Sequence, residues 1–95
     1  MKHYIIAKFN EQVADKAAAV SEITALYAGA CEVPGVSGVR VIPNVVSRPN
    51  RYDVMIVLDM APEALNAWDG CALHHQWKDT WGPLLEKKCI FDAEG

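Results

Sequence analysis

The side chains most able to carry out chemistry in this sequence are its three histidines, His3, His74 and His75. An imidazole titrates near neutral pH, so a positioned histidine can take a proton from a substrate as a general base. His74 is the candidate for that role, and the alternative is a packed histidine that only hydrogen-bonds on its helix. His75 points about 100° away from it on a helix, so we expect His75 to be solvated. His3 is either an orienting group in the same catalytic site or a half-exposed residue at a strand end.

Apolar residues that could line a ligand pocket accompany these histidines. Trp68 and Trp77 could form an aromatic wall for a flat ligand. Tryptophans at helical spacing more often belong to a hydrophobic core, and that alternative stays open. Ile5 lies two residues after His3, so on a strand both side chains share one face. We therefore include Ile5 in the candidate pocket.

The sequence predicts no metal or cofactor site. Two histidines are too few, since zinc usually takes at least three protein ligands. The three cysteines, Cys31, Cys71 and Cys89, are odd in number and widely spaced, so they form neither a disulfide framework nor a zinc set. Free thiols are typical of a reducing cytoplasm, where we expect the protein to reside.

The hydrophobic pattern predicts four strands that would position these residues. Residues 2–9 alternate strictly, which predicts a strand with one continuous face: His3, Ile5, Ala7 and Phe9. Residues 36–45 read as a second strand, interrupted near a proline. Residues 52–60 alternate most clearly of all, and residues 88–92 form a last short strand.

Two helical segments separate these strands. Asn10 offers an N-cap for a first helix over residues 11–28, which carries apolar residues at helical spacing. Pro62 suits the first position of a second helix. Gly70 ends or kinks that helix, and helical spacing resumes over residues 72–81.

The resulting order, β-α-β-β-α-β, predicts a ferredoxin-like α+β fold. Two right-handed crossovers place both helices on one face of a four-stranded antiparallel sheet. The other face carries apolar side chains that no remaining segment could cover, namely Tyr4, Ile6, Met55, Val57 and some of Val39, Val41 and Ile42. We therefore expect a second copy to cover it, sheet against sheet, as a homodimer.

Composition limits the remaining possibilities. The 95 residues suffice for one domain, residues 1–95, and 52% of them are hydrophobic. The formal net charge is -3, and no basic cluster is large enough to follow a phosphate backbone, so we expect no nucleic-acid partner. No apolar run approaches the length of a membrane span, so we expect no membrane partner.

Four segments, in this order and spacing, resemble the stress-responsive A/B barrel (Dabb) family. They are residues 2–9, similar to its opening strand; residues 33–36 (VPGV), similar to its IPGV turn; residues 52–55 (YDVM), similar to its YD strand opening; and residues 64–81, similar to its ALxxYxxHPxHxxF helix pair. The matches cover nearly the whole chain. The resemblance implies a dimeric α/β barrel with a pocket between helices and sheet in each subunit.

The resemblance also implies roles for individual residues. Most family members have no assigned activity, but one similar plant protein is a polyketide cyclase, which closes a poly-β-keto chain by aldol condensation. Its base corresponds to His74 and its first-strand histidine to His3. Its tyrosine is replaced by Trp68, which has an indole N–H but no phenol. Cys71 replaces the first histidine of the motif, and Val54 replaces a further pocket histidine.

Three functions follow as hypotheses. The first is a dimeric protein that binds a small apolar or aromatic ligand in the pocket lined by Trp68, Trp77, Ile5 and Val54. The second is a cyclase-like or lyase-type enzyme with His74 as general base and His3 orienting the substrate. The third is a structural stress-response protein whose pocket is filled by its own side chains.

Overall fold

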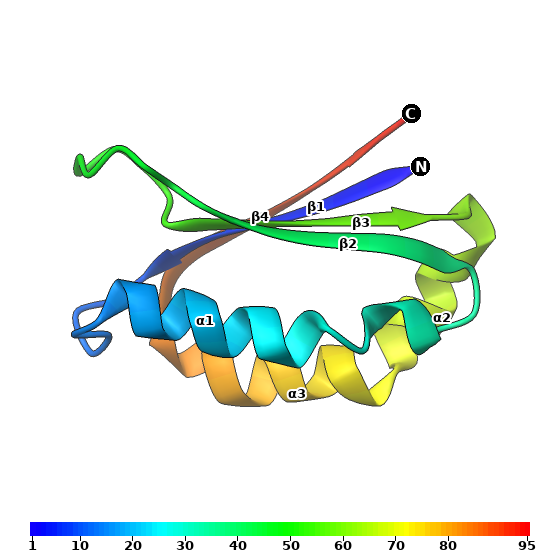
Figure 1. Cartoon of the computed structure of the whole chain (residues 1–95), viewed down its shortest axis with the longest axis horizontal. Coiled ribbons are helices and arrows are strands. Elements are labelled where there is room, and N and C mark those ends of the chain that lie inside the picture. Colours follow the sequence, from blue (N-terminus) through cyan, green and yellow to red (C-terminus); the bar gives the residue numbers. More distant parts are fainter.

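The computed structural model describes residues 1–95 (Figure 1). Its elements, in chain order, are β1 (Lys2–Phe9), α1 (Lys16–Tyr27), β2 (Val36–Pro43), β3 (Val54–Met60), α2 (Leu65–Gly70), α3 (Ala72–Trp81) and β4 (Leu85–Ala93). Short 3-10 turns at Ala30–Glu32, Pro62–Ala64 and Gly82–Leu84 connect them. This is the predicted β-α-β-β-α-β order, with the second helix divided into α2 and α3. No helix has the length and apolar character needed to cross a membrane.

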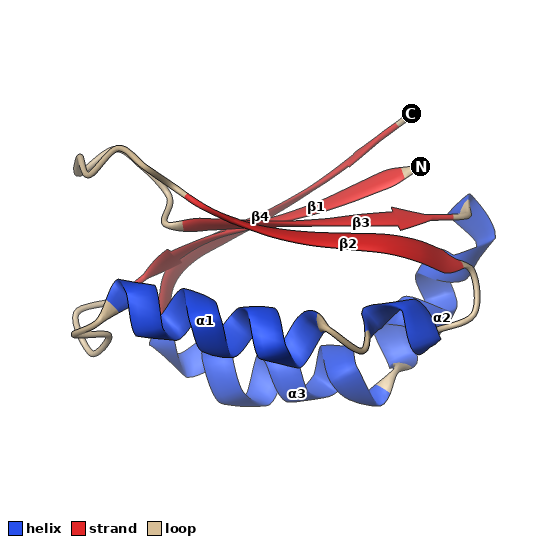
Figure 2. Ribbon diagram, in the orientation of Figure 1, coloured by secondary structure: helices blue, strands red, loops and turns tan.

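The four strands form one antiparallel sheet in the order β2-β3-β1-β4. All helices lie on one side of this sheet, and the other side carries none (Figure 2). β1 is central and sets the register, because Ile5 is opposite both Ile56 of β3 and Ile90 of β4. The ferredoxin-like prediction is confirmed.

The hydrophobic core lies between the sheet and the helices. Alternate residues of β1 and β3 point into it, as predicted, and Ile5, Ile56 and Leu58 are fully buried. From the helix side, large aromatic residues complete this core: Tyr27, Trp68, Trp77 and Trp81. Burial of each large side chain contributes about 1.5–3 kcal/mol to folding. The space that could form a pocket between sheet and helices is therefore occupied by the protein's own side chains.

Some element boundaries differ from the prediction. The first helix begins at Lys16, not at residue 11, because Asp15 is the N-cap: its Oδ1 accepts a hydrogen bond of 3.0 Å from the backbone N of Ala18. Asn10 instead accepts from the backbone N of Gln12 at 2.9 Å and stabilises a turn before the helix. The last strand runs over nine residues, from 85 to 93, because it pairs with β1 along its whole length.

The turn between the Ala30–Glu32 segment and β2 depends on a glycine. Gly35 has a φ of +89°, a conformation that L side chains rarely adopt. Its carbonyl oxygen accepts a hydrogen bond of 2.9 Å from the N of Ala61. A Cβ at this position would lie 2.6 Å from the Cβ of Ala64. The turn thus fixes the start of β2 against the segment that leads into α2.

Replacing Gly35 with alanine should therefore destabilise the protein by about 2–4 kcal/mol, since it adds backbone strain to a steric clash. Gly70→Ala is the matched control, because a Cβ there has nothing within 4 Å. That control should be neutral or stabilising by up to about 1 kcal/mol. Urea unfolding followed by circular dichroism measures both, and equal stabilities would contradict the role given to Gly35.

Candidate functional site

Three aromatic side chains from three different helices meet in the helix layer. Tyr27 comes from the last turn of α1, Trp68 from α2 and His74 from the first turn of α3. The ring centroids of Tyr27 and Trp68 are 5.9 Å apart, and those of Trp68 and His74 are 5.6 Å apart. We call Tyr27, Trp68 and His74 the aromatic cluster.

Each member of the aromatic cluster has a buried polar atom without a hydrogen-bond partner in the protein. These atoms are Tyr27 Oη, Trp68 Nε1 and His74 Nδ1, and no other side-chain nitrogen or oxygen atom shares this property. Buried polar groups are nearly always paired, because leaving one unpaired costs about 1–3 kcal/mol. The indole N–H donates, the phenol can donate or accept, and an imidazole nitrogen does either according to its tautomer. The cluster therefore holds hydrogen-bonding groups that the protein itself leaves unpaired.

Burial also shifts the pKa values of two members. It raises the pKa of the Tyr27 phenol far above its usual range, and the neighbouring Cys71 thiol adds to this effect. For His74, burial lowers the pKa below its ordinary value of 6.5, and the charge of Lys78 lowers it further, although Asp69 opposes both. At neutral pH the phenol is thus a neutral donor, and the imidazole is neutral and able to accept a proton.

The break between α2 and α3 gives His74 its position. Gly70 ends α2, and Cys71 adopts an extended conformation with φ -77° and ψ 157°. Its Sγ then caps α3 by accepting from the backbone N of His74 at 3.4 Å. The predicted break at Gly70 is confirmed, and it lets the two short helices present Trp68 and His74 to each other.

A surface groove of about 500 Å³ lies next to this junction. It is bounded by the end of α1, the turn that follows it and the α2–α3 break, and its apolar lining includes Leu26, Val33, Ala67 and Leu73. Cys71 lies between the groove and the aromatic cluster, because it lines the groove and its Sγ accepts from the backbone N of His74 at 3.4 Å. Cys71 and His74 are both partly exposed to solvent, whereas Tyr27 and Trp68 are fully buried.

The first-strand histidine lies in a different environment. His3 is buried on the helix-facing side of β1, and its Nδ1 is 2.5 Å from Oδ1 of Asp92 on β4. A carboxylate in this position fixes the tautomer and orientation of an imidazole. No hydrogen bond or ring contact joins His3 to His74, and the catalytic pairing of the two histidines stays a prediction. His75 is exposed, as expected.

The predicted pocket-lining residues are core residues in this structure. Trp68 and Ile5 are fully buried, Trp77 is 1% exposed, and none of the three lines a cavity. Val54 borders a small cavity of about 140 Å³ together with residues of the helix-free face of the sheet. Their contact with a ligand stays a prediction.

Two participants were not predicted from the sequence. Tyr27 falls within the helix predicted over residues 11–28, and the only sequence signal for a site there is a hydroxyl at a position expected to face the core. Asp92 has no sequence signal as the partner of His3, because only the pairing of β1 with β4 brings the two together.

Comparison with known proteins identifies solved structures that share this fold. No protein-family model matches the sequence, and no curated protein matches it either. A dimeric ferredoxin-like protein of unknown function from Bacteroides fragilis matches with a TM-score of 0.81 at 12% identity, over 99% of this chain and 94% of that one. A Dabb family protein from Mesorhizobium loti matches with a TM-score of 0.66 at 14% identity, over 99% and 96%.

An enzyme also shares the fold. Hydroxynitrile lyase from Passiflora edulis matches with a TM-score of 0.74 at 11% identity, over 95% of this chain and 87% of that one. At such low identities these matches show the fold alone. They are consistent with the stress-responsive A/B barrel family that the sequence motifs resemble.

The electrostatics of His74 can be tested directly. We expect its pKa, followed by NMR, to lie below 6.5, and Lys78→Ala to raise it because a nearby positive charge is removed. Lys87→Ala is the control, since Lys87 is exposed and is not among the charges that act on His74. Because the unfolded chain binds the proton first, His74 should lower the stability of the fold as the pH falls below 6.5. A pKa above 6.5 would contradict this assignment.

Proposed function

We propose that this protein binds a small, mostly apolar or aromatic ligand at the α1–α2–α3 junction, through the groove and the aromatic cluster behind it. The observation that carries the proposal is that the three buried side-chain nitrogen and oxygen atoms without a hydrogen-bond partner all belong to this one cluster. A ligand oxygen that accepts hydrogen bonds from Trp68 Nε1 and from Tyr27 Oη would satisfy two of the atoms that the protein leaves unpaired. The apolar lining of the groove fits the rest of such a molecule.

Catalysis of a lyase or cyclase type is the second candidate. It is favoured by the lowered pKa of His74, which keeps the imidazole in its basic form at neutral pH. The neighbouring phenol of Tyr27 could donate a proton or a hydrogen bond to a developing oxyanion. An enzyme with the same fold, the Passiflora edulis hydroxynitrile lyase, supports this candidate by analogy only.

Ligand binding can be tested by thermal shift with benzoate, phenylacetate and 2,4-dihydroxybenzoate as probes. At one hundred times its dissociation constant, a ligand stabilises the fold by about 2.7 kcal/mol, which raises Tm by about 10 °C or more. His74→Gln should reduce this shift, whereas His75→Gln, which changes an exposed neighbour of the same type, should not.

Tyr27→Phe separates binding from folding. Loss of the unpartnered hydroxyl should leave the unliganded protein as stable as wild type, or about 1 kcal/mol more stable, while weakening ligand binding about tenfold. If the variant is instead less stable and no probe shifts either protein, the cluster is structural. The third hypothesis, a protein without a ligand, would then be preferred.

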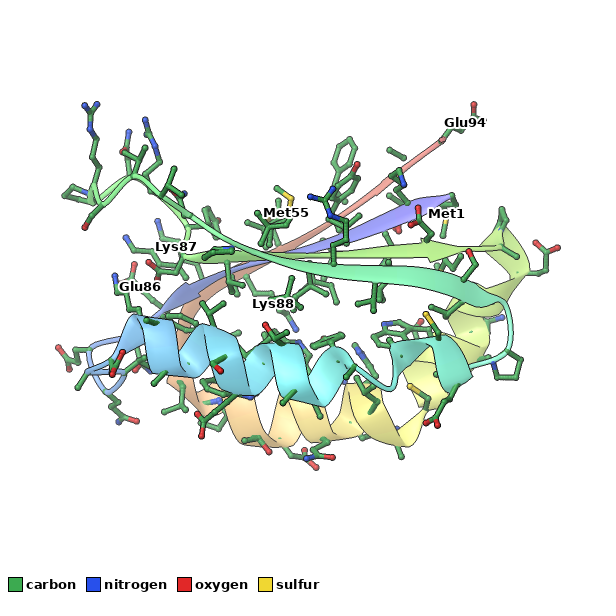
Figure 3. All side chains as sticks on the ribbon, in the orientation of Figure 1. Met1, Met55, Glu86, Lys87, Lys88 and Glu94 are labelled. Carbon is green, nitrogen blue, oxygen red and sulfur yellow. The ribbon has the colours of Figure 1, made fainter.

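We also propose that two copies associate through the helix-free face of the sheet. Apolar side chains on this face come from every strand: Tyr4, Ile6, Ile42, Met55, Val57 and Phe91. Phe91 is 62% exposed, and Met55 points away from the helices (Figure 3). An uncovered apolar patch of this kind marks an interaction surface. The Bacteroides fragilis neighbour, described as dimeric, supports the proposal.

A dimer predicts that light scattering coupled to gel filtration gives twice the chain mass of 10.5 kDa. Phe91→Lys should shift the protein toward monomer, because it places a charge in an apolar interface. Thr80→Lys is the control, since Thr80 is exposed on the helix side. A wild-type protein of monomer mass at micromolar concentration would rule out the dimer.

We also propose that the protein resides in a reducing compartment such as the cytoplasm. None of its three cysteines forms a disulfide, and Cys31 and Cys89 are exposed. Exposed thiols persist where glutathione keeps them reduced.

A further inference from the structure

The loop between β2 and β3, residues 44–53, extends beyond the sheet (Figure 1). Two cavities lie between this loop and the first turns of α1. These cavities are at the N-terminal end of α1, whereas the groove of the proposed ligand site is at its C-terminal end. They therefore belong to a separate region, which we call the loop cleft.

One part of the loop cleft is strongly basic. This cavity of about 250 Å³ is lined by four cationic side chains, Lys8, Lys16, Arg48 and Arg51, and by one carboxylate, Asp53. The whole chain, by contrast, has a net charge of -3. Positive charge is thus concentrated in one hollow of an acidic protein.

Salt bridges neutralise only two of the four cations. Lys16 Nζ lies 3.0 Å from Oδ1 of Asp53, and Lys8 Nζ lies 3.5 Å from an oxygen of Glu86. Arg48 and Arg51 have no carboxylate partner, although Arg51 donates to the side-chain oxygen of the adjacent asparagine at 2.8 Å. Two guanidinium groups therefore remain available at the cavity, and their planar fork of donors matches the oxygens of a phosphate group.

The loop is held in place by contacts that leave these arginines free. Oδ2 of Asp53 accepts a hydrogen bond of 2.7 Å from the backbone N of Phe9. Lys8 Nζ donates to the backbone oxygen of Pro49 at 2.6 Å. Both contacts tie the loop to β1, so the arginines are presented by an anchored segment. Such preorganisation reduces the entropic cost of binding.

The second part of the loop cleft is more apolar. This adjoining cavity of about 320 Å³ shares four lining residues with the basic one: Lys16, Val46, Ser47 and Asp53. Its remaining lining comes largely from small and aliphatic side chains: Ala17, Val20, Pro43 and Val45. Val45 is 93% exposed and Val46 is 40% exposed, so both can contact a ligand.

We propose that the loop cleft binds a small amphipathic anion, with a phosphate-like dianionic group between Arg48 and Arg51 and an apolar body beside Val46. The charge matches, because the two unpaired guanidiniums balance two negative charges. The space is sufficient, since 250 Å³ equals roughly eight water molecules at ~30 Å³ each, and a phosphate has five heavy atoms. A membrane of anionic lipid is a poorer fit, because a recessed cavity on an acidic protein cannot engage a flat negative surface closely.

Phenyl phosphate and inorganic phosphate, titrated at constant ionic strength and followed by amide NMR, test this site. We expect shifts at Lys16 and in residues 46–51, with phenyl phosphate binding more tightly. Arg48→Ala and Arg51→Ala should each weaken the binding of both probes about tenfold. Lys78→Ala is the control, because it removes one positive charge from an exposed position on α3, outside the loop cleft.

Each contrary outcome would overturn a definite part of the proposal. Equal losses of phosphate affinity in Lys78→Ala and Arg51→Ala would show that binding depends on net charge alone and would reject the site. Val46→Ser should remove the advantage of phenyl phosphate without weakening inorganic phosphate, and a failure to do so would reject the apolar half. Sedimentation with phosphatidylglycerol vesicles in the absence of any phosphate binding would identify a lipid surface instead and reject the small ligand.

Discussion

The alternation of β1, paired on both sides, is the constraint on which the other features depend. Its even-numbered and odd-numbered residues face opposite sides of the sheet. The odd-numbered side builds the core around Ile5 and brings His3 to Asp92. The even-numbered side leaves Tyr4 and Ile6 on the helix-free face. A register shift of one residue would exchange these sides and remove the core, the histidine–carboxylate pair and the proposed dimer surface together.

The helix layer combines dense aromatic packing with buried polar atoms that have no hydrogen-bond partner in the protein. A continuous helix through residues 65–81 would have placed Trp68 and His74 six residues apart, on faces that diverge by about 120°. The break at Gly70 and Cys71 removes that restriction and allows the two rings to lie 5.6 Å apart. Three unpaired buried atoms cost stability, and proteins tolerate such costs where function requires them.

The sequence predicted the elements whose patterns are local. β1 and α3 were predicted over their observed ranges. Burial of one face produces strict alternation in a strand and helical spacing in a helix, and both patterns can be seen in the sequence. The start of α1 was wrong because Asn10 and Asp15 are both good N-caps, and only the fold decides between them. Candidate sites were harder, since their geometry is long-range. His74 and Trp68 could be named, but their contact with Tyr27 depends on how three helices pack.

The loop cleft could likewise not be predicted from the sequence, because its residues are far apart along the chain. Its cations, at positions 8, 16, 48 and 51, are spread over half of the chain, and in the sequence only the last two form a small cluster. The fold gathers them because Asp53 hydrogen-bonds to the strand end at Phe9 and pairs with Lys16. A single carboxylate thus organises the positive charge that surrounds it. Because α1 has 12 residues, the loop cleft and the aromatic cluster lie about 18 Å apart along its axis. A small ligand cannot span that distance, so the two proposed sites require different molecules or distant parts of one long molecule.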